Sequence, residues 1–321
     1  MRKIACILII LFISETILPQ SINDETWNHH VHIFSLLLLE DLRINTESSK
    51  LIQGANELYT NIDTIMNKVI SDRIVLISTG YGYSKELKTE KQLARLLSGE
   101  NDYLFEAYNL YKERIFPFVG INPSESYSLE ELKRCYFLFD KFGIKLHFHS
   151  SKIELLNSVE IERIKPIFQF ASSNRIPLLI HFKNHNKNFG KEDVESFFKN
   201  LTNKENKLTI IFAHTSGDGM INKKTREIAT EILKINEEYQ QNIYFDISAA
   251  IWNKYLDNYE LSDNDKRELL IEIGFDKIIY GSDYPATEFE SFRQRLKYRL
   301  NLTDEEFIQL TTNSPLKEYA R

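Results

Sequence analysis

The chain has 321 residues, of which 42% are hydrophobic and 27% are charged. This composition is typical of a globular protein with a large core, and it excludes a disordered or fibrous chain. The 46 acidic and 40 basic residues give a formal net charge of -6. Because no stripe of basic residues is present, nucleic acid is excluded as an expected partner.

The first segment has the pattern of an export signal. Arg2 and Lys3 precede an unbroken apolar run, residues 4–13, and polar residues follow. The run is shorter than the ~20 residues that cross a bilayer, so we interpret residues 1–21 as a signal peptide and residues 22–321 as one domain. We therefore expect a periplasmic or extracellular protein without stable membrane insertion after processing, or a cytoplasmic one if the segment is not a signal. Cleavage would leave Cys135 as the only cysteine, which excludes an internal disulfide.

Short apolar segments alternate with longer segments of helical periodicity along the rest of the chain. Strands are expected at 30–34, 74–78, 116–121, 143–149, 177–182, 208–214, 243–248 and 277–282. Helices are expected at 129–142, 160–174, 191–201, 225–239, 263–273 and 304–319, with one more around 51–70. Ser128, Ser262 and Thr303 are the expected N-caps of three of these helices.

Eight strand and helix units predict an α/β fold, a single-domain (β/α)8 TIM barrel. Segments such as "LTIIFAH" and "KIIYGSD" are nearly continuous apolar runs, as expected for parallel strands that helices cover. The alternative is an open, doubly wound sheet. In a barrel, the catalytic residues lie at the carboxyl ends of the strands.

The stretch "WNHHVHIF" carries two histidines with the same strand parity. Side chains alternate along a strand, so His30 and His32 face one side, and His29 points away. Further polar residues end later strands: His147, His181, His214 and Asp283. Nitrogen and oxygen donors that converge at one level of a barrel predict a metal site with an open position for water.

This ordered set resembles the amidohydrolase superfamily, specifically the amidohydrolase-related group of mononuclear hydrolases, lactonases and nonoxidative decarboxylases. "HHVHIF" resembles the H-x-H motif of the first strand, "GIKLH" the fourth-strand motif, and "PLLIH" and "IIFAH" the histidines of strands five and six. "IIYGSDYP" resembles the eighth-strand motif, and "TTNSPLKEY" the closing segment with Asn313 in the expected place. The likeness spans nearly the whole barrel.

The resemblance implies that His30, His32 and His181 are metal ligands, with Asp283 as a ligand, a proton shuttle or both. His214 would then be a catalytic acid or an electrophilic residue. The chain departs from the family pattern at Asn28, where an aspartate is usual. An amide carries no charge to raise the basicity of a ligand, so we expect weaker metal binding or a different metal.

The expected cofactor is a divalent metal, zinc first and manganese second. Such an ion lowers the pKa of a bound water toward ~7 and polarises a carbonyl group. The leading hypothesis is therefore a hydrolase of a small amide, ester or lactone, with Asp283 and His214 as catalytic residues. The alternatives are a nonoxidative decarboxylase of an aromatic or enolic acid and an exported, non-catalytic barrel that binds a metal or ligand. A small-molecule partner is expected, and a homo-oligomer is left open.

Two residues on the fourth strand are candidates for binding the substrate. Lys145 shares the parity of His147; it could bind a substrate carboxylate, which we favour, form a carbamate between two metals, or reach solvent. His147 is expected near the site, whereas His149 and His185 are expected on the surface. Loop residues that could set specificity are Tyr81, Tyr83, Asn122 and Trp252.

Overall fold

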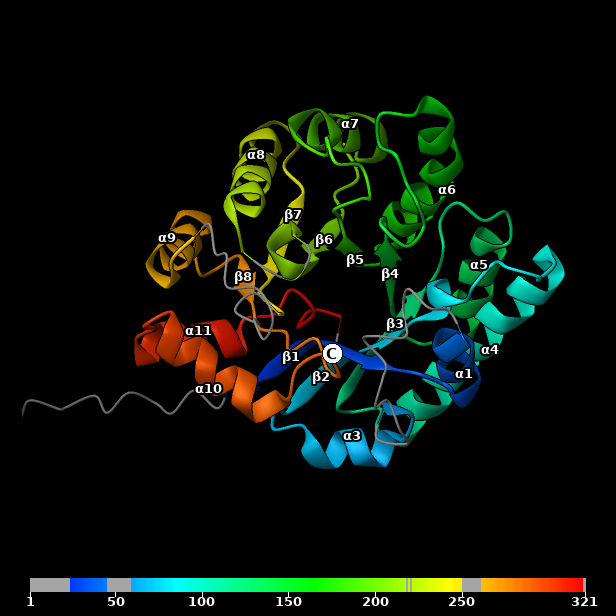
Figure 1. The fold of residues 1–321 in the computed structure, drawn as a ribbon, viewed down its shortest axis with the longest axis horizontal. Coiled ribbons are helices and arrows are strands. Elements are labelled where there is room, and N and C mark those ends of the chain that lie inside the picture. The colour runs from blue at the N-terminus through cyan, green and yellow to red at the C-terminus, as the bar shows by residue number, and fades with distance from the viewer. Residues whose placement is uncertain (1–23, 45–58, 218, 220, 250–260, 320–321) are drawn as a thin grey trace, which may run out of the picture.

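The computed structural model describes residues 24–44, 59–217, 219, 221–249 and 261–319. Eight parallel strands lie side by side in sequence order and surround a central axis (Figure 1). The strands are β1 (Trp27–Ile33), β2 (Arg73–Ser78), β3 (Ile115–Gly120), β4 (Gly143–His147), β5 (Leu178–His181), β6 (Thr209–Phe212), β7 (Asn242–Asp246) and β8 (Ile278–Ile279).

The barrel closes between its first and last strands. The backbone N–H of His32 donates to the carbonyl of Tyr284, and that of Asp283 donates to the carbonyl of His30, both at 2.8 Å. An isolated parallel bridge also joins Val31 to Tyr284. These contacts confirm the predicted (β/α)8 barrel and exclude an open sheet.

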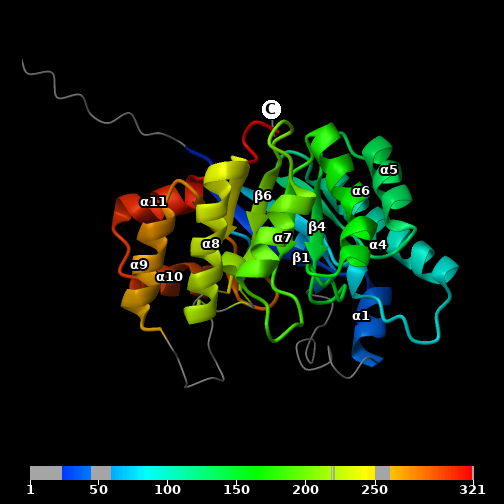
Figure 2. The same ribbon diagram turned by 90° about the horizontal axis from the view of Figure 1, so that it is seen from above.

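Helices surround the strands (Figures 1 and 2). They are α1 (Leu36–Ile44), α3 (Ile62–Lys68), α4 (Glu90–Leu110), α5 (Ser128–Leu138), α6 (Ser158–Asn174), α7 (Lys191–Leu201), α8 (Lys223–Tyr239), α9 (Asp263–Ile273), α10 (Phe289–Arg299) and α11 (Asp304–Thr312). Helices α7 and α9 match their expected bounds, whereas α1, α4 and α10 add to the expected set. Within the described ranges, no helix is both long and apolar enough to cross a membrane.

Two of the helix predictions need correction. The predicted helix 304–319 ends at Thr312, because Asn313 adopts extended backbone angles and its side chain donates to the carbonyls of Asp276 and Ile278. Ser128 does not cap α5; its hydroxyl donates to the carbonyl of Asn122 at 2.5 Å. The caps at Ser262 and Thr303 are confirmed, since both side chains accept a backbone N–H of the first helical turn.

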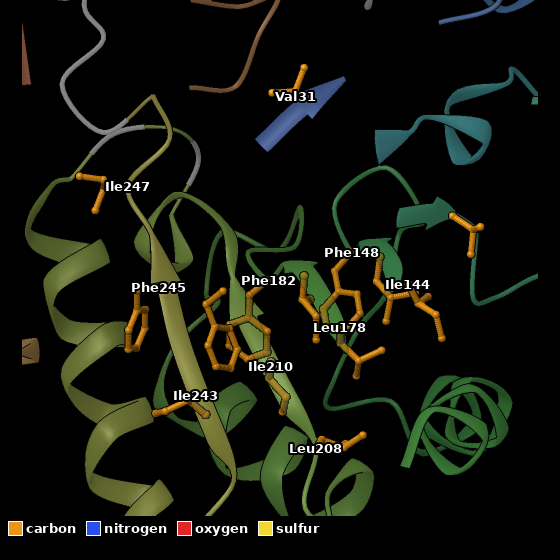
Figure 3. Packing of buried hydrophobic residues seen from close by; sticks show 14 of the residues in the cluster. Val31, Ile144, Phe148, Leu178, Phe182, Leu208, Ile210, Ile243, Phe245 and Ile247 are labelled. Atoms are coloured by element: carbon orange, nitrogen blue, oxygen red, sulfur yellow. The ribbon is translucent and has the colours of Figure 1, made fainter. Parts of the chain in front are cut away.

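The apolar core around the strands forms two layers, because strand side chains alternate between the helices and the barrel axis, and a smaller third cluster includes Leu38 and Leu42 of α1. Figure 3 shows the outer layer, in which Ile243 and Phe245 of β7 pack in one cluster with residues such as Ile210 and Phe182. Tyr244 and Asp246 have the opposite parity on β7. The alternation therefore places Asp246 on the side of the barrel axis.

The inner layer contains residues from both ends of the described chain. Trp27, at the start of β1, and Leu316, after α11, belong to the same buried cluster as Phe116 and Phe118. The Tyr319 ring makes an edge contact with Phe116 at 6.3 Å, and its hydroxyl lies 3.2 Å from that of Thr209 at the start of β6. The C-terminal segment thus packs against the amino-terminal end of the barrel.

Several expectations lie outside the described residues. They are the signal peptide at 1–21, the first part of the helix expected around 51–70, and Trp252. The described part of that helix is α3, residues Ile62–Lys68. Export therefore stays a prediction.

Candidate metal centre

Strand β1 directs two imidazoles into the carboxyl end of the barrel. The Nε2 atoms of His30 and His32 lie 3.2 Å apart, so the two rings share a face as their parity predicted. The register of β1 against β2 shifts between Asn28 and Val31, and this irregularity lies directly at the first of the two histidines. The first half of the candidate site is therefore carried by one strand.

His29 is held away from this pair. Its Nδ1 lies 2.9 Å from the carbonyl of Tyr280, and its Nε2 lies 2.8 Å from the hydroxyl of Ser314. Burial lowers the pKa of the His29 imidazole to about 4, although the Tyr280 carbonyl acts in the opposite direction. His29 joins β1 to the C-terminal segment, as expected of a residue outside the site.

Asp283 brings a carboxylate to the two imidazoles. It follows β8 with a φ of 62°, a left-handed conformation that is costly for a residue with a Cβ. Its Oδ1 lies 3.5 Å from the Nε2 of both His30 and His32. The side chains of His32 and Asp283 are 12% and 18% exposed, whereas His30 is 1% exposed. The open side of the site therefore lies at His32 and Asp283.

His214 joins the group from a left-handed turn. The predicted strand 208–214 ends at Phe212, and His214, Thr215 and Ser216 follow with φ values of 54°, 54° and 66°. The His214 ring lies 5.0 Å from the His30 ring, centroid to centroid. Ligand atoms of His30, His214 and Asp283 all lie within 4.8 Å of one another, which makes this trio a candidate metal centre.

Asp246 is a site residue that the sequence analysis missed. It is fully buried at the end of β7, and its Oδ2 lies 2.9 Å from Nδ1 of His30. Its Oδ1 accepts the backbone N–H of His214 at 3.0 Å. The available signal was an aspartate at the end of an otherwise apolar strand, "IYFD", the same pattern that identified Asp283.

The electrostatics of the cluster keep its potential metal ligands, two imidazoles and a carboxylate, in their metal-binding protonation states. Burial lowers the pKa of His30 to about 3 and lowers that of His32. Burial raises the pKa of Asp283, but His30, His214 and the hydrogen bond with His32 outweigh it and hold the pKa below its usual range. Neutral imidazoles and an ionised carboxylate are the states in which these groups bind metals.

This donor set fits a divalent ion. Imidazole nitrogens suit zinc and other transition metals, whereas a carboxylate also suits manganese. His30, His32 and Asp283 would hold the ion, with His181 or His214 as the next donor. The donor chemistry does not choose between zinc and manganese.

His181 and His147 form a stacked pair on the neighbouring strands. Their ring centroids lie 3.9 Å apart with planes inclined by 8°, and His181 lies 5.2 Å from His214. The ring of Tyr81 lies 5.3 Å from His147. The structure therefore places His181 beside the trio, with its ring against His147, and gives the site an aromatic wall.

Lys145 is buried inside the barrel, 1% exposed, so the interpretation that it reaches solvent is wrong. Burial lowers the pKa of its ammonium group to about 8, although Asp246 and Asp283 act in the opposite direction. Within the described ranges it forms no ion pair at 4.0 Å or less. A buried cation without a paired anion is costly, and a negatively charged group of a substrate could compensate it.

The structure gives Asn28 a role other than the one expected. Its Nδ2 donates to the hydroxyl of Ser282 at 2.9 Å, and its Oδ1 accepts the backbone N–H of Ser282 at 2.9 Å and of His30 at 3.3 Å. Asn28 thus joins β1 to the segment after β8. The carboxylate beside Nδ1 of His30 is supplied by Asp246 instead.

The remaining candidates lie around the mouth or outside the site. His149 and His185 are exposed, as expected, and His185 lies 3.6 Å from Glu154. Tyr83 is buried, and its hydroxyl donates to Glu100 of α4 at 3.3 Å. This proton is therefore used within the protein and not for a substrate. Asn122 is buried and accepts the backbone N–H of Ser124 at 3.2 Å.

A barrel with histidines and an aspartate at its strand ends is the arrangement of a metal-dependent enzyme. Residues 85–317 match the sequence profile of the amidohydrolase family, and the chain belongs to that family. No curated protein matches it significantly.

Solved structures share the fold at low sequence identity. A 5-carboxyvanillate decarboxylase from Novosphingobium aromaticivorans, with bound manganese and 3-methoxy-4-hydroxy-5-nitrobenzoic acid, is 14% identical over 93% of this chain and 97% of its own, with a TM-score of 0.64. A 2,6-dihydroxybenzoate decarboxylase from Rhizobium is 12% identical over 90% and 96%, with a TM-score of 0.56. An amidohydrolase II is 13% identical over 89% and 96%, with a TM-score of 0.58.

Proposed function

We propose that the protein is a metal-dependent, nonoxidative decarboxylase of a small aromatic or enolic carboxylic acid. The observation that carries this proposal is the buried ammonium group of Lys145, which lacks an ion pair in the described structure. Only the more distant charges of Asp246 and Asp283 favour its protonated form. An acid that enters the barrel mouth would bring the missing negative charge. This proposal favours the alternative of the sequence analysis over hydrolysis.

The walls of the site support a planar substrate. The stacked rings of His147 and His181, with Tyr81 against His147, form one side of the mouth. The Phe34 ring stacks on His32 with the ring centroids 6.0 Å apart. Aromatic surfaces favour offset or edge contacts with a ring. Several structural neighbours are decarboxylases of aromatic acids, which supports the same substrate class.

The residues of the site would have separate roles in metal binding, substrate binding and proton transfer. His30, His32 and Asp283, with His181 as the expected fourth ligand, would hold a divalent ion, which would withdraw electron density from the oxygen atoms of the substrate. Lys145 pairs with an anionic oxygen and orients the acid. The reaction breaks the bond between a ring or enolic carbon and the carboxylate carbon, releases CO2 and forms a new C–H bond with one proton. His214 can transfer that proton, because its Nδ1 lies 2.9 Å from Ser248 and only Nε2 remains for the site.

One observation favours hydrolysis as the second candidate. The pKa of Asp283 is held below its usual range by His30, His214 and His32 against the effect of burial, so the carboxylate at the open side is ionised. An ionised carboxylate can accept a proton from water, as the hydrolysis of an ester, amide or lactone requires. Zinc stays the ion that the sequence favoured, whereas manganese is the ion of the Novosphingobium neighbour.

A substrate panel separates the two reactions. The purified chain, loaded with Mn²⁺ or with Zn²⁺, is incubated with hydroxylated benzoic acids, enolic acids, esters, amides and lactones. We expect CO2 release from one of the acids and, in D2O, one deuterium at the carbon that lost it. Cleavage of an ester, amide or lactone without any CO2 release would overturn the decarboxylase proposal in favour of hydrolysis.

The role of Lys145 is tested in the same assay. Lys145→Met should lower kcat/KM by about 10²-fold, since an anion would then be buried without a partner. Lys165→Met is the matched control, because Lys165 lies on α6 in an exposed pair with Glu162. An unchanged kcat/KM in Lys145→Met would contradict the assignment.

A further inference from the structure

The two carboxylate oxygens of Asp246 have different partners. Oδ1 accepts three donors, the backbone N–H of His214 at 3.0 Å, the backbone N–H of Ser248 at 2.9 Å and the hydroxyl of Ser248. Oδ2 lies 2.9 Å from Nδ1 of His30. Two of the donors on Oδ1 are backbone groups that cannot reverse their direction, so the orientation of the carboxylate is fixed.

The partner of His30 determines which of its nitrogens carries the proton. An ionised carboxylate only accepts hydrogen bonds, so Nδ1 of a neutral His30 must hold the proton. The ionised state is supported by Oδ1 of Asp246, which accepts three hydrogen bonds that stabilise a carboxylate anion. Nε2 of His30 is then unprotonated and its lone pair can bind a metal. This atom lies 3.2 Å from Nε2 of His32 and 3.5 Å from Oδ1 of Asp283.

His214 has the same tautomer for a different reason. Its Nδ1 lies 3.1 Å from the backbone carbonyl of Ser248 and 2.9 Å from the Ser248 hydroxyl, which itself donates to Asp246. A carbonyl only accepts, so Nδ1 carries the proton and Nε2 is bare. The turn that presents this ring contains three consecutive residues in the left-handed conformation, which is unfavourable for residues other than glycine. Asp246 binds the first N–H of that turn.

We propose that Asp246 is a positioning residue that sets the tautomer of His30 and anchors the left-handed turn presenting His214. One buried side chain on β7 thereby keeps Nε2 of His30 and Nε2 of His214 unprotonated and directed toward Asp283. The inference rests on the metal centre of the proposed function, but not on which reaction that centre catalyses.

The arrangement also changes the expected role of His214. A neutral imidazole with its proton on Nδ1 cannot donate from Nε2. His214 therefore begins as a proton acceptor or as a ligand, and it becomes an acid only after it has taken up a proton. For a phenolic or enolic substrate, the hydroxyl group is a source of that proton.

The variant Asp246→Asn tests the proposal with little change in shape. Oδ1 must remain an oxygen, because it accepts two backbone N–H groups, so the amide nitrogen takes the place of Oδ2. That nitrogen donates to Nδ1 of His30 and requires the proton to move to Nε2. His214 serves as an internal control, since its acceptor is a backbone carbonyl that the variant leaves in place.

The measurement is 15N NMR of the full chain labelled at histidine, without metal, together with calorimetric titration of Mn²⁺ and Zn²⁺. In the wild type we expect bare Nε2 atoms on His30 and His214. In Asp246→Asn we expect His30 to carry its proton on Nε2, His214 to stay unchanged, and metal affinity to fall about 10- to 100-fold. Asp193→Asn is the matched control, because Asp193 is equally buried and accepts the backbone N–H of Gly190.

The wild-type spectrum alone can overturn the proposal, if His30 carries its proton on Nε2. An unchanged His30 tautomer in a folded Asp246→Asn protein, or unchanged metal affinity, would also overturn it. If the wild type binds neither metal while the tautomers are as expected, the proposed function fails and the positioning role stands.

Discussion

The two sides of the barrel mouth are built differently. On the side of β1, β7 and β8, His30 contacts Asp246, Ser248, His32 and Asp283 within 3.5 Å, and Asp246 holds the turn of His214. On the side of β4 and β5, ring stacking dominates, and Lys145 is buried without an ion pair in the described structure. The polar groups of the first side are held by contacts with one another, as a metal centre requires. The second side contains the positive charge of Lys145, which an anionic substrate would neutralise.

The largest effect is expected from removing the charge on the metal side. Asp283→Asn should lower activity about 10³-fold and weaken metal binding, because a neutral amide replaces the carboxylate beside His30 and His32. Metal analysis and steady-state kinetics measure both effects. Asp276→Asn, an exposed carboxylate outside the site, is the control. Full activity in Asp283→Asn would show that the metal side is wrongly assigned.

The border between the two sides is tested at His181 and His214. We expect His181→Ala to lower metal affinity by about 10-fold or more. His214→Ala should lower kcat by about 10²- to 10⁴-fold with metal retained, if it exchanges the proton. The opposite pattern, with metal lost only in His214→Ala, would assign His214 as the ligand, as its place in the trio with His30 and Asp283 allows.

On the substrate side, Lys145→Met should stabilise the protein while it impairs binding. Burial lowers the pKa of Lys145 from 10.5 to about 8, so the folded state disfavours the charged form, and this cost is fully present below pH 8. We expect the free energy of unfolding to rise by about 1–3 kcal/mol at pH 7. The gain should fade between pH 8 and 10.5, and urea unfolding across this range measures it. A destabilised Lys145→Met protein would show that the ammonium group is already compensated.

The smallest effect concerns the pH dependence of stability without metal. Burial lowers the pKa of His30 from 6.5 to about 3 and that of His29 to about 4. Between these values and 6.5 the unfolded chain binds more protons, so stability should fall as the pH drops below 6.5, by about 1 kcal/mol per pH unit for each group. Urea midpoints at pH 7, 6 and 5 measure the slope, and the exposed His185→Gln variant should keep it. A stability that does not change from pH 7 to 5 would contradict the burial of both imidazoles as neutral groups.

The fold was predictable because strand and helix periodicity extends over most of the chain, and the parity of His30 and His32 followed from strand geometry alone. Asp283 and His214 were identified because each ends an apolar run. Asp246 ends such a run too, but a lone aspartate after a strand also looks like the start of a loop. Its importance depends on the turn at 214–216, whose left-handed backbone comes from tertiary contacts and not from local sequence preference. The contacts of Asn28 likewise depend on Ser282, which is distant in sequence and adjacent only in the closed barrel.

The C-terminal segment adds a constraint on folding. Leu316 is buried with Trp27 and Phe116, and Tyr319 lies against Phe116, so the end of the barrel opposite the mouth is covered by residues from both ends of the described chain. A barrel formed from β1 to β7 alone lacks the residues that cover this end. Aromatic surface is exposed there until Leu316 and Tyr319 pack, which makes the last stage of folding the interval in which aggregation is most favoured.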